Sequence, residues 1–221
     1  PAAGGLPEDE PVWANVVLNR ALAQWSEGDG RWPGINWKSH AMRAIVGLVD
    51  DPHQAVQTPL ELNFRKDHVA VFAASGWGKT TLLQTTMLSL AATHSPAELH
   101  IYVMDFGGRM RALFERLPHV GAVVAPDETE RVYRLFRRLA DDLERRKQLI
   151  SEAGARDLYE YNASDPARAL SALLVVIDNY AELKESFDSL VPALNALLRE
   201  SRAYGIHFLI TADRPVVMGS L

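Results

Sequence analysis

The residues best suited to chemistry lie between Val69 and Thr86, in the stretch V-A-V-F-A-A-S-G-W-G-K-T-T-L-L-Q-T-T. Its centre, G-W-G-K-T-T, matches the second part of the phosphate-loop pattern G-x-x-x-x-G-K-[ST]. Small residues in such a loop let successive backbone N–H groups surround phosphate oxygens, and the following helix points its positive end at the same anion. The pattern therefore predicts phosphate contacts from Ser75, Gly76, Trp77, Gly78, Lys79, Thr80 and Thr81.

Three residues of this loop have separate expectations. Lys79 is expected to reach the β- and γ-phosphates of a nucleotide, and Thr80 to offer its hydroxyl to Mg²⁺. Ala73 occupies the first glycine position of the pattern. Alanine enters positive φ only at a cost, so we expect a slightly altered start of the loop. The alternative is a chance match at an ordinary turn between a strand and a helix.

A second candidate group ends the apolar run L-L-V-V-I-D, Leu173 to Asp178. In P-loop nucleotidases an aspartate at the end of such a strand holds Mg²⁺ through a water, opposite the loop threonine. The order of the two motifs along the chain is the expected one. The alternative interpretation is that Asp178 caps a helix or forms a turn.

Asn179 stands where hydrolysing relatives of this class usually carry a glutamate that orients the attacking water. An amide can hold a water by hydrogen bonds, but it cannot accept the proton of that water at neutral pH. We therefore expect nucleotide binding with slow or absent hydrolysis. Glu182 could substitute, although we expect it to begin the next helix.

Other polar residues have weaker assignments. Thr211 ends the apolar run H-F-L-I-T, where related folds place a residue that senses the γ-phosphate. Arg199, Arg202 and Arg214 are candidates for reaching the phosphate of a neighbouring subunit, and the alternative for each is a structural arginine. Trp77 is expected to point to solvent or to contact an adjacent module.

These residues need a scaffold of successive apolar strands separated by helices. That pattern predicts an α/β fold with a mostly parallel sheet, flanked by helices and joined by right-handed crossovers. Ligands bind at the C-terminal ends of such strands, where the loop, Asp105, Asp178 and Thr211 are expected. The expected strands are residues 69–72, 99–104, 120–124, 170–178 and 206–211.

Helices are expected at residues 79–93, 110–117, 127–150 and 186–204, and Gly205 is expected to end the last of them. Asp127 and Glu130 suggest a capping arrangement for the long helix. The charged face of that helix is either solvated and ion-paired or a contact surface for a neighbouring protein. Before the core, we expect a lead-in at residues 1–11, a helix at 12–25, and a strand pair at 43–50 and 59–64.

Composition limits the class of protein. The chain has 221 residues, 48% of them hydrophobic, which suits one large globular domain. It has no cysteine, so disulfides, thiolate metal sites and cysteine nucleophiles are excluded. The formal net charge of −5 disfavours a dedicated duplex-DNA binder. The N-terminal sequence lacks the parts of a signal peptide and resembles a linker.

Together these motifs resemble the FtsK/SpoIIIE group of P-loop motor ATPases. The segment from Arg202 to Pro215 is similar to that group's run ending in T-x-R-P. Within the group, the chain resembles a module of the type VII secretion ATPases EccC and EssC. Asn179 and Ala73 resemble the later modules, particularly the second of three in tandem. The segments that carry this resemblance are Ile45–Leu60, His68–Phe72, Leu117–Val120, Asp127–Glu130 and Asp178–Tyr180.

The resemblance implies a RecA-like domain at residues 43–221 that binds ATP with Mg²⁺, preceded by a linker and helix at 1–42. It implies further strands past Leu221, so the domain would be truncated at its C-terminus. It also implies a membrane-anchored parent at the cytoplasmic face, with type VII secretion membrane components as partners. Assembly with other ATPase modules in a hexamer, and small helical-hairpin substrates with a W-x-G turn, follow from the same resemblance; no nucleic acid is expected.

Three functions stay open from the sequence. The first is an ATP-binding, weakly hydrolysing module of a protein-export motor. The second is a DNA-translocating ATPase, which needs a catalytic glutamate and a basic inner surface. The third is an interaction module that kept the fold but lost the nucleotide, an option that Ala73 and Asn179 allow.

Overall fold

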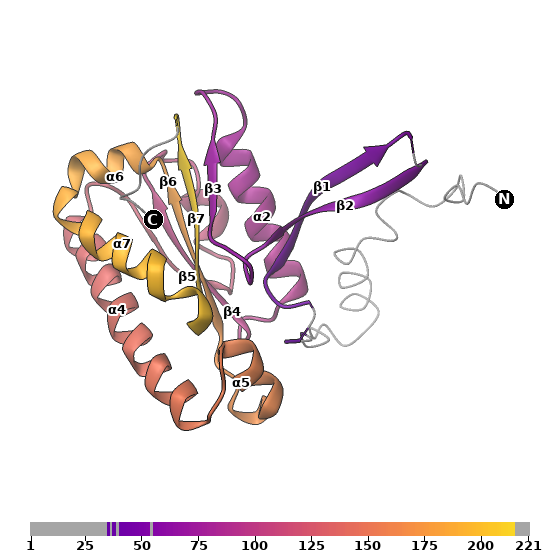
Figure 1. Ribbon diagram of the computed structural model, residues 1–221. Helices are drawn as coiled ribbons and strands as arrows, with labels where there is room; N and C mark the ends of the chain where they lie inside the picture. Colours follow the sequence, from indigo (N-terminus) through magenta and orange to yellow (C-terminus); the bar gives the residue numbers. More distant parts are fainter. Residues whose placement is uncertain (1–34, 36, 39, 54, 215–221) are drawn as a thin grey trace.

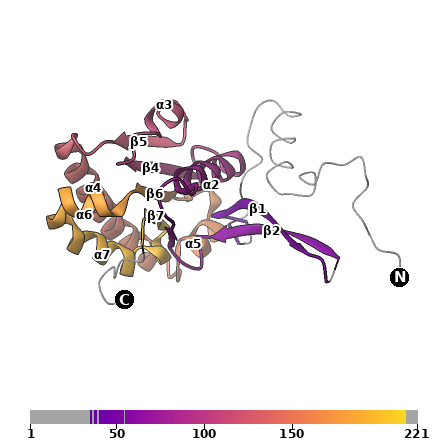
Figure 2. The same cartoon turned by 90° about the horizontal axis from the view of Figure 1, so that it is seen from above.

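The body of the molecule is a parallel sheet with helices on both faces (Figures 1 and 2). This computed structural model describes residues 35, 37–38, 40–53 and 55–214, so the expected lead-in and the expected helix at 12–25 lie outside the described residues. The described sheet has five strands in the order β3-β7-β6-β4-β5. They are β3 (Val69–Phe72), β4 (Leu99–Asp105), β5 (Val120–Val124), β6 (Ala172–Asp178) and β7 (Ile206–Ala212).

Strand β6 is the clearest example of why these residues form a central strand. All seven of its residues are buried, and it pairs in parallel with β4 on one side and β7 on the other. Because side chains alternate along a strand, Leu173, Val175 and Ile177 enter one apolar layer and Leu174 and Val176 enter the other. A continuous apolar run is therefore the sequence that a strand covered on both faces requires.

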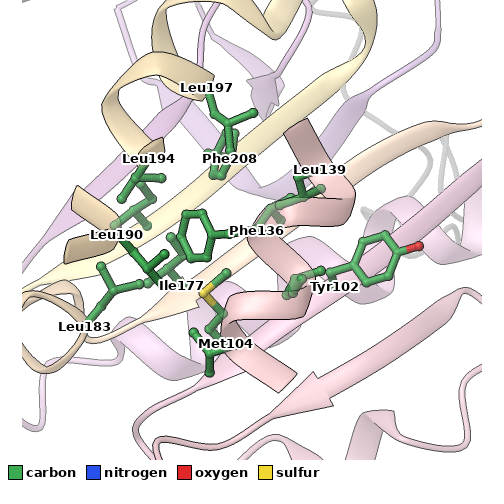
Figure 3. Close-up of a cluster of buried hydrophobic side chains, with 14 of the residues drawn as sticks. Tyr102, Met104, Phe136, Leu139, Ile177, Leu183, Leu190, Leu194, Leu197 and Phe208 are labelled. Carbon is green, nitrogen blue, oxygen red and sulfur yellow. The ribbon is translucent and has the colours of Figure 1, made fainter. Parts of the chain in front are cut away.

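Each face of the sheet has its own helices. One layer contains α4 (Thr129–Glu152), α6 (Tyr180–Ser186) and α7 (Val191–Glu200), whose apolar side chains meet the sheet in the cluster of Figure 3. The other layer contains α2 (Lys79–Thr93), α3 (Arg111–Phe114) and α5 (Leu158–Ser164). None of the described helices is both long and apolar enough to cross a membrane. Short 3-10 turns are η2 (Pro166–Arg168), η3 (Asp188–Leu190) and η4 (Arg202–Tyr204).

An antiparallel hairpin of β1 (Arg43–Asp51) and β2 (Val56–Asn63) projects from the body (Figure 1). Two buried hydrogen bonds fasten its base to α2. The Ile45 N–H donates to Ser89 Oγ at 2.8 Å, and the Met42 N–H donates to His94 Nε2 at 3.1 Å. Just before the hairpin, Trp37, Ala41 and Met42 are buried in the α2 layer.

The α/β fold, the parallel sheet and the preceding strand pair are confirmed. Gly205 also ends the last helical turn as expected, with a left-handed φ of 75°. The expected cap of the long helix is wrong. Helix α4 begins at Thr129 with no side-chain cap, and Glu130 pairs instead with Arg134 in the same helix.

The expected single helix at 186–204 is also wrong, because the chain there divides into η3, α7 and η4. Pro192 lies in the first turn of α7. Proline has no N–H to donate and is tolerated at a helix start, so the regular helix begins there rather than at Ser186. Glu182 lies in the first turn of α6, as expected.

Strand β3 differs from the expectation of a buried strand. It lies at the edge of the described sheet and pairs only with β7 among the described strands. Its residues alternate between half-buried and exposed, and Phe72 is 42% exposed. The apolar run of four residues indicated a strand correctly, but a run that short carries no information on how many neighbours the strand has.

Candidate nucleotide-binding site

The phosphate-loop residues connect the end of β3 to the start of α2. Gly76 and Gly78 have left-handed φ values of 82° and 81°, which glycine adopts without strain. Ala73 is not among the described residues with positive φ, and its N–H donates to the Ala212 carbonyl at 3.3 Å, extending the ladder with β7. Alanine therefore fits the first glycine position because the backbone there is still strand-like. Trp77 is 81% exposed at the tip of the loop.

Lys79 folds over the loop that precedes it. Its Nζ donates to the carbonyls of Ala73 at 2.6 Å and Ala74 at 3.1 Å, and forms an ion pair with Asp213 Oδ1 at 2.7 Å. The lysine side chain is only 13% exposed. The ammonium group is thus held at the concave side of the loop, in reach of an anion that enters it.

Thr80, Asp178 and Thr211 meet at the C-terminal end of the sheet. Thr80 Oγ1 donates to Asp178 Oδ2 at 3.1 Å, and Thr211 Oγ1 donates to Asp178 Oδ1 at 2.8 Å. Asp178 and Thr211 are buried. Both carboxylate oxygens therefore have fixed partners, and Thr211 positions Asp178. A contact of Thr211 with the γ-phosphate stays a prediction.

This oxygen pair fits Mg²⁺. Hydroxyl and carboxylate oxygens are ligands that this hard cation prefers, and Mg²⁺ usually keeps several of its waters. The Asp178 carboxylate lies 3.1 Å from Thr80 Oγ1, so it is placed to hold, through a water, an ion that the Thr80 hydroxyl would bind directly. Among the residues that the structure describes, no group of three or more acidic or histidine side chains forms a separate metal site.

Asn179 adopts a left-handed backbone, with φ 73° and ψ 77°, between β6 and α6. Asparagine is among the few non-glycine residues that tolerate this region. Its backbone N–H donates to Thr211 Oγ1 at 2.9 Å, which ties it to the same cluster. Glu182 Oε1 accepts a hydrogen bond from Ser186 Oγ at 2.8 Å on its own helix.

The loop after β4 forms another wall of the site, which the sequence motifs did not indicate. A Cβ atom added to Gly107 would lie 2.5 Å from Asp178 Oδ2. The loop is fixed by Asp105, whose carboxylate accepts N–H bonds from Arg109, Met110 and Arg111 at 2.8–3.1 Å. Asp105 is thus a structural residue, and only glycine leaves room for the carboxylate of Asp178. In the sequence, the two adjacent glycines 107 and 108 shortly after the strand end were the signal that could have indicated this close approach.

The three candidate arginines lie at different ends of the sheet. Arg199 and Arg202 precede β7, away from the phosphate loop, and Arg202 Nη1 donates to the carbonyls of Arg65 and Lys66. Arg214 follows β7 and is exposed on the same edge as the loop. Of the three, only Arg214 is therefore near the candidate site of its own chain.

Comparisons with known proteins agree with this geometry. The model of the FtsK/SpoIIIE family matches residues 36–217. The chain is 30% identical to the ESX secretion system protein EccC of Thermomonospora curvata, with 96% of this chain and 17% of that protein covered. It is 31% identical to EccC4 of the ESX-4 secretion system of Mycobacterium tuberculosis, with 94% and 16% covered. The chain thus spans about one sixth of the length of these curated relatives.

The chain is also similar in structure to solved EccC and EssC proteins. The chain superposes on Thermomonospora curvata EccC (ATPases 2 and 3), in complex with a signal sequence peptide, with a TM-score of 0.74, 29% identity, and 85% and 34% of the two chains covered. It superposes on EssC (ATPases 2 and 3) from Geobacillus thermodenitrificans with a TM-score of 0.73, 28% identity, and 79% and 33% covered.

Proposed function

Because this chain belongs to the FtsK/SpoIIIE family, whose model covers residues 36–217, we propose that it is an ATP-binding module of a type VII secretion motor. The observation that carries the proposal is the 3.1 Å contact between Thr80 Oγ1 and Asp178 Oδ2 beside the phosphate loop. That contact brings together the hydroxyl expected to bind a nucleotide-bound metal and the carboxylate expected to hold the same metal through a water.

Each group has a distinct task in this proposal. The loop amides and the N-terminus of α2 would bind phosphate oxygens, and Lys79, which pairs with Asp213 in this structure, would contact the β- and γ-phosphates. Thr80 and, through a water, Asp178 would hold Mg²⁺, which would neutralise phosphate charge. Thr211 and Gly107 act as positioning residues, since one bonds the Asp178 carboxylate and the other leaves room for it.

Hydrolysis is proposed to be slow. Asn179 cannot accept a proton from water at neutral pH. After the adjacent Asp178, Glu182 is the next carboxylate in sequence, and it accepts a hydrogen bond from Ser186 on α6. ATP would then act mainly as a ligand that stabilises the conformation that binds it.

The setting of the module is part of the same proposal. The structural relatives contain ATPases 2 and 3 of EccC or EssC, which supports tandem modules in one parent chain. A hexameric assembly of such modules is part of the proposal. One relative was solved with a signal sequence peptide, which supports recognition of an export substrate. We propose that the substrates of this module are small helical-hairpin proteins. We assign the parent to the cytoplasmic face of the membrane, and the module most closely to the second position in the tandem.

Titration calorimetry with ATP and Mg²⁺, beside a steady-state hydrolysis assay, tests the proposal. We expect a dissociation constant on the order of micromolar, corresponding to about −8 kcal/mol, with negligible turnover. The variant Lys79→Ala should lose both the binding heat and the rise in melting temperature on adding ATP. Brisk turnover contradicts slow hydrolysis, and the absence of an ATP response in both proteins points to a nucleotide-free interaction module.

A further inference from the structure

Five cationic side chains surround a cleft at the end of the sheet opposite the phosphate loop. Arg65 and Lys66 precede β3 and Arg202 precedes β7, whereas the phosphate loop and Asp178 follow their strands. The cleft consists of two adjoining hollows of about 400 and 510 Å³ that share Arg65, Arg156, Asp157 and Tyr159 in their linings. We call it the basic cleft, and its cations are Lys38, Arg65, Lys66, Arg156 and Arg202.

Two of these arginines are held by neutral groups. Arg202 Nη1 donates to the carbonyls of Arg65, at 3.1 Å, and Lys66. Arg65 Nη1 donates to the Lys38 carbonyl at 2.5 Å, and its guanidinium lies 4.4 Å above the Tyr159 ring. A carbonyl or an aromatic ring orients a guanidinium without cancelling its net charge. The arginine heads are therefore fixed in advance, so less side-chain entropy is lost when a ligand binds.

This arrangement differs from the charged face of α4. There the cations pair with carboxylates: Arg145 with Asp142 at 2.7 Å, Lys147 with Glu144 at 2.7 Å, and Arg134 with Glu130. Those charges compensate one another, as in an ordinary solvated helix face. The basic cleft keeps an excess of positive charge among its described lining residues. Even without Lys38 its cations outnumber the lining carboxylates, since Arg65, Lys66, Arg156 and Arg202 lie against only Asp157 and Glu160.

The two carboxylates also bear on the class of ligand. Glu160 pairs with Arg156 at 3.0 Å, and Asp157 Oδ1 accepts the Glu160 N–H at 2.8 Å. A polyphosphate backbone has only acceptors and offers no donor to either carboxylate. A peptide brings carboxylates for the arginines and also backbone N–H donors for Asp157 and Glu160, and an apolar group of it can lie against Ala163.

We propose that the basic cleft binds an acidic peptide segment of a partner protein. The site is separate from the nucleotide, since its residues lie at the opposite end of the strands. Peptide binding can therefore be tested independently of ATP binding, and a failure of one proposal leaves the other unaffected. The guanidinium groups of Arg65 and Arg202 supply the fixed contacts, and Lys66 and Arg156 supply exposed charge at the rim; the Arg156 side chain is 88% exposed.

Fluorescence anisotropy with the full chain tests this proposal. The probes are a short fluorescein-labelled peptide rich in glutamate, the same peptide with glutamine at every glutamate position, and an oligothymidylate of equal charge. We expect the glutamate peptide to bind with an affinity that falls with added salt, and the glutamine peptide to bind at least about tenfold more weakly. Equal binding of the two peptides, no binding of the glutamate peptide, or tighter binding of the oligothymidylate would overturn the proposal.

Matched variants locate the site. The double variant Lys66→Gln with Arg156→Gln changes two exposed side chains of the basic cleft, and we expect it to weaken glutamate-peptide binding by about tenfold. The control is Arg134→Gln with Arg145→Gln on α4, which removes the same charge from exposed positions. It should bind the peptide within about twofold of the unchanged chain. Equal losses of peptide affinity in both double variants would mean that binding depends only on net charge, and this would contradict a specific site at the basic cleft.

Discussion

Thr80 and Asp178 are 98 positions apart in the chain, yet the hydroxyl of one donates to the carboxylate of the other at 3.1 Å. Thr80 lies in the first turn of α2, and Asp178 is the last residue of β6. The two elements are brought together because β3 and β6 flank β7 in one parallel sheet, so their C-terminal ends meet at one edge. The candidate metal site is therefore a product of the topology and not of either motif alone.

Substituting Gly107 with alanine should weaken metal-dependent ATP binding. The new Cβ would lie 2.5 Å from Asp178 Oδ2, a distance that forces the carboxylate or the loop to move. We expect the dissociation constant for ATP with Mg²⁺ to rise about tenfold, and the constant in EDTA to change less than about twofold. Titration calorimetry in the two buffers measures both.

Gly47→Ala is the matched control for this substitution. Its added Cβ would meet Leu60 Cδ2 at an ordinary 3.7 Å, far from the site in the hairpin. It should bind ATP as the unchanged chain does. Equal losses with and without Mg²⁺ in Gly107→Ala would indicate general damage to the fold and would refute the positioning role.

Thr211→Val should destabilise the fold by about 1–3 kcal/mol, because it leaves the buried Asp178 Oδ1 without the Thr211 hydroxyl as its donor. The half-buried Asn179 N–H loses its acceptor as well. Urea denaturation measures the change in the free energy of unfolding. In the control Thr86→Val, the lost bond is to the Leu82 carbonyl within α2, and the loss should stay below about 1 kcal/mol. Similar losses in the two variants would argue against a special role for Thr211.

Asn179→Glu should raise ATP turnover by about 10²-fold, since it supplies the carboxylate base that the site lacks. It should also lower stability by about 1 kcal/mol, because glutamate adopts the left-handed backbone of this position less readily than asparagine. Asn179→Gln carries the same backbone cost without a base. A gain in turnover with glutamine, or none with glutamate, would show that residue 179 does not limit hydrolysis.

Acid should weaken the fold through buried histidines. Burial lowers the pKa of His94 from 6.5 to about 4, against a smaller opposing effect from its bond to the Leu90 carbonyl. Its Nε2 accepts the Met42 N–H, so the folded state stabilises the neutral ring. As the pH falls, His94 is protonated in the unfolded chain before it is protonated in the folded one. Its contribution to the free energy of unfolding is therefore constant above about pH 6.5 and decreases as the pH drops from about 6.5 to about 4.

The size of this acid effect can be isolated with His94→Gln. Glutamine can still accept the Met42 N–H and does not titrate. Between pH 7.5 and pH 5, the variant should lose about 1–2 kcal/mol less stability than the unchanged chain in urea denaturation. Burial also lowers the pKa of His68 to about 4, so a residual slope of the same sign remains. Identical slopes in both proteins would contradict the assignment to His94.

Local patterns were sufficient for much of the fold and of the site. The apolar run ending at Asp178, and the small-residue turn before Lys79, are contiguous in sequence, so their strand and loop positions could be predicted. Gly107 and Thr211 owe their roles to a contact with Asp178 that exists only in the folded sheet, and no local pattern reports such a contact. The expected cap at Asp127 was wrong for a related reason: the matching spacing did not determine where α4 begins. A contact of Trp77 with an adjacent module stays a prediction.

A double-mutant cycle on ATP binding tests most directly whether Thr80 and Asp178 hold one ion. The variants are Thr80→Val, Asp178→Asn and their combination, each titrated with ATP in Mg²⁺ and in EDTA. If one ion joins both side chains, each single variant should lose about tenfold in affinity with Mg²⁺, and the double variant should lose little more than the worse single one. This coupling should vanish in EDTA. Multiplicative losses with Mg²⁺, or a coupling of the same size in EDTA, would contradict a shared ion.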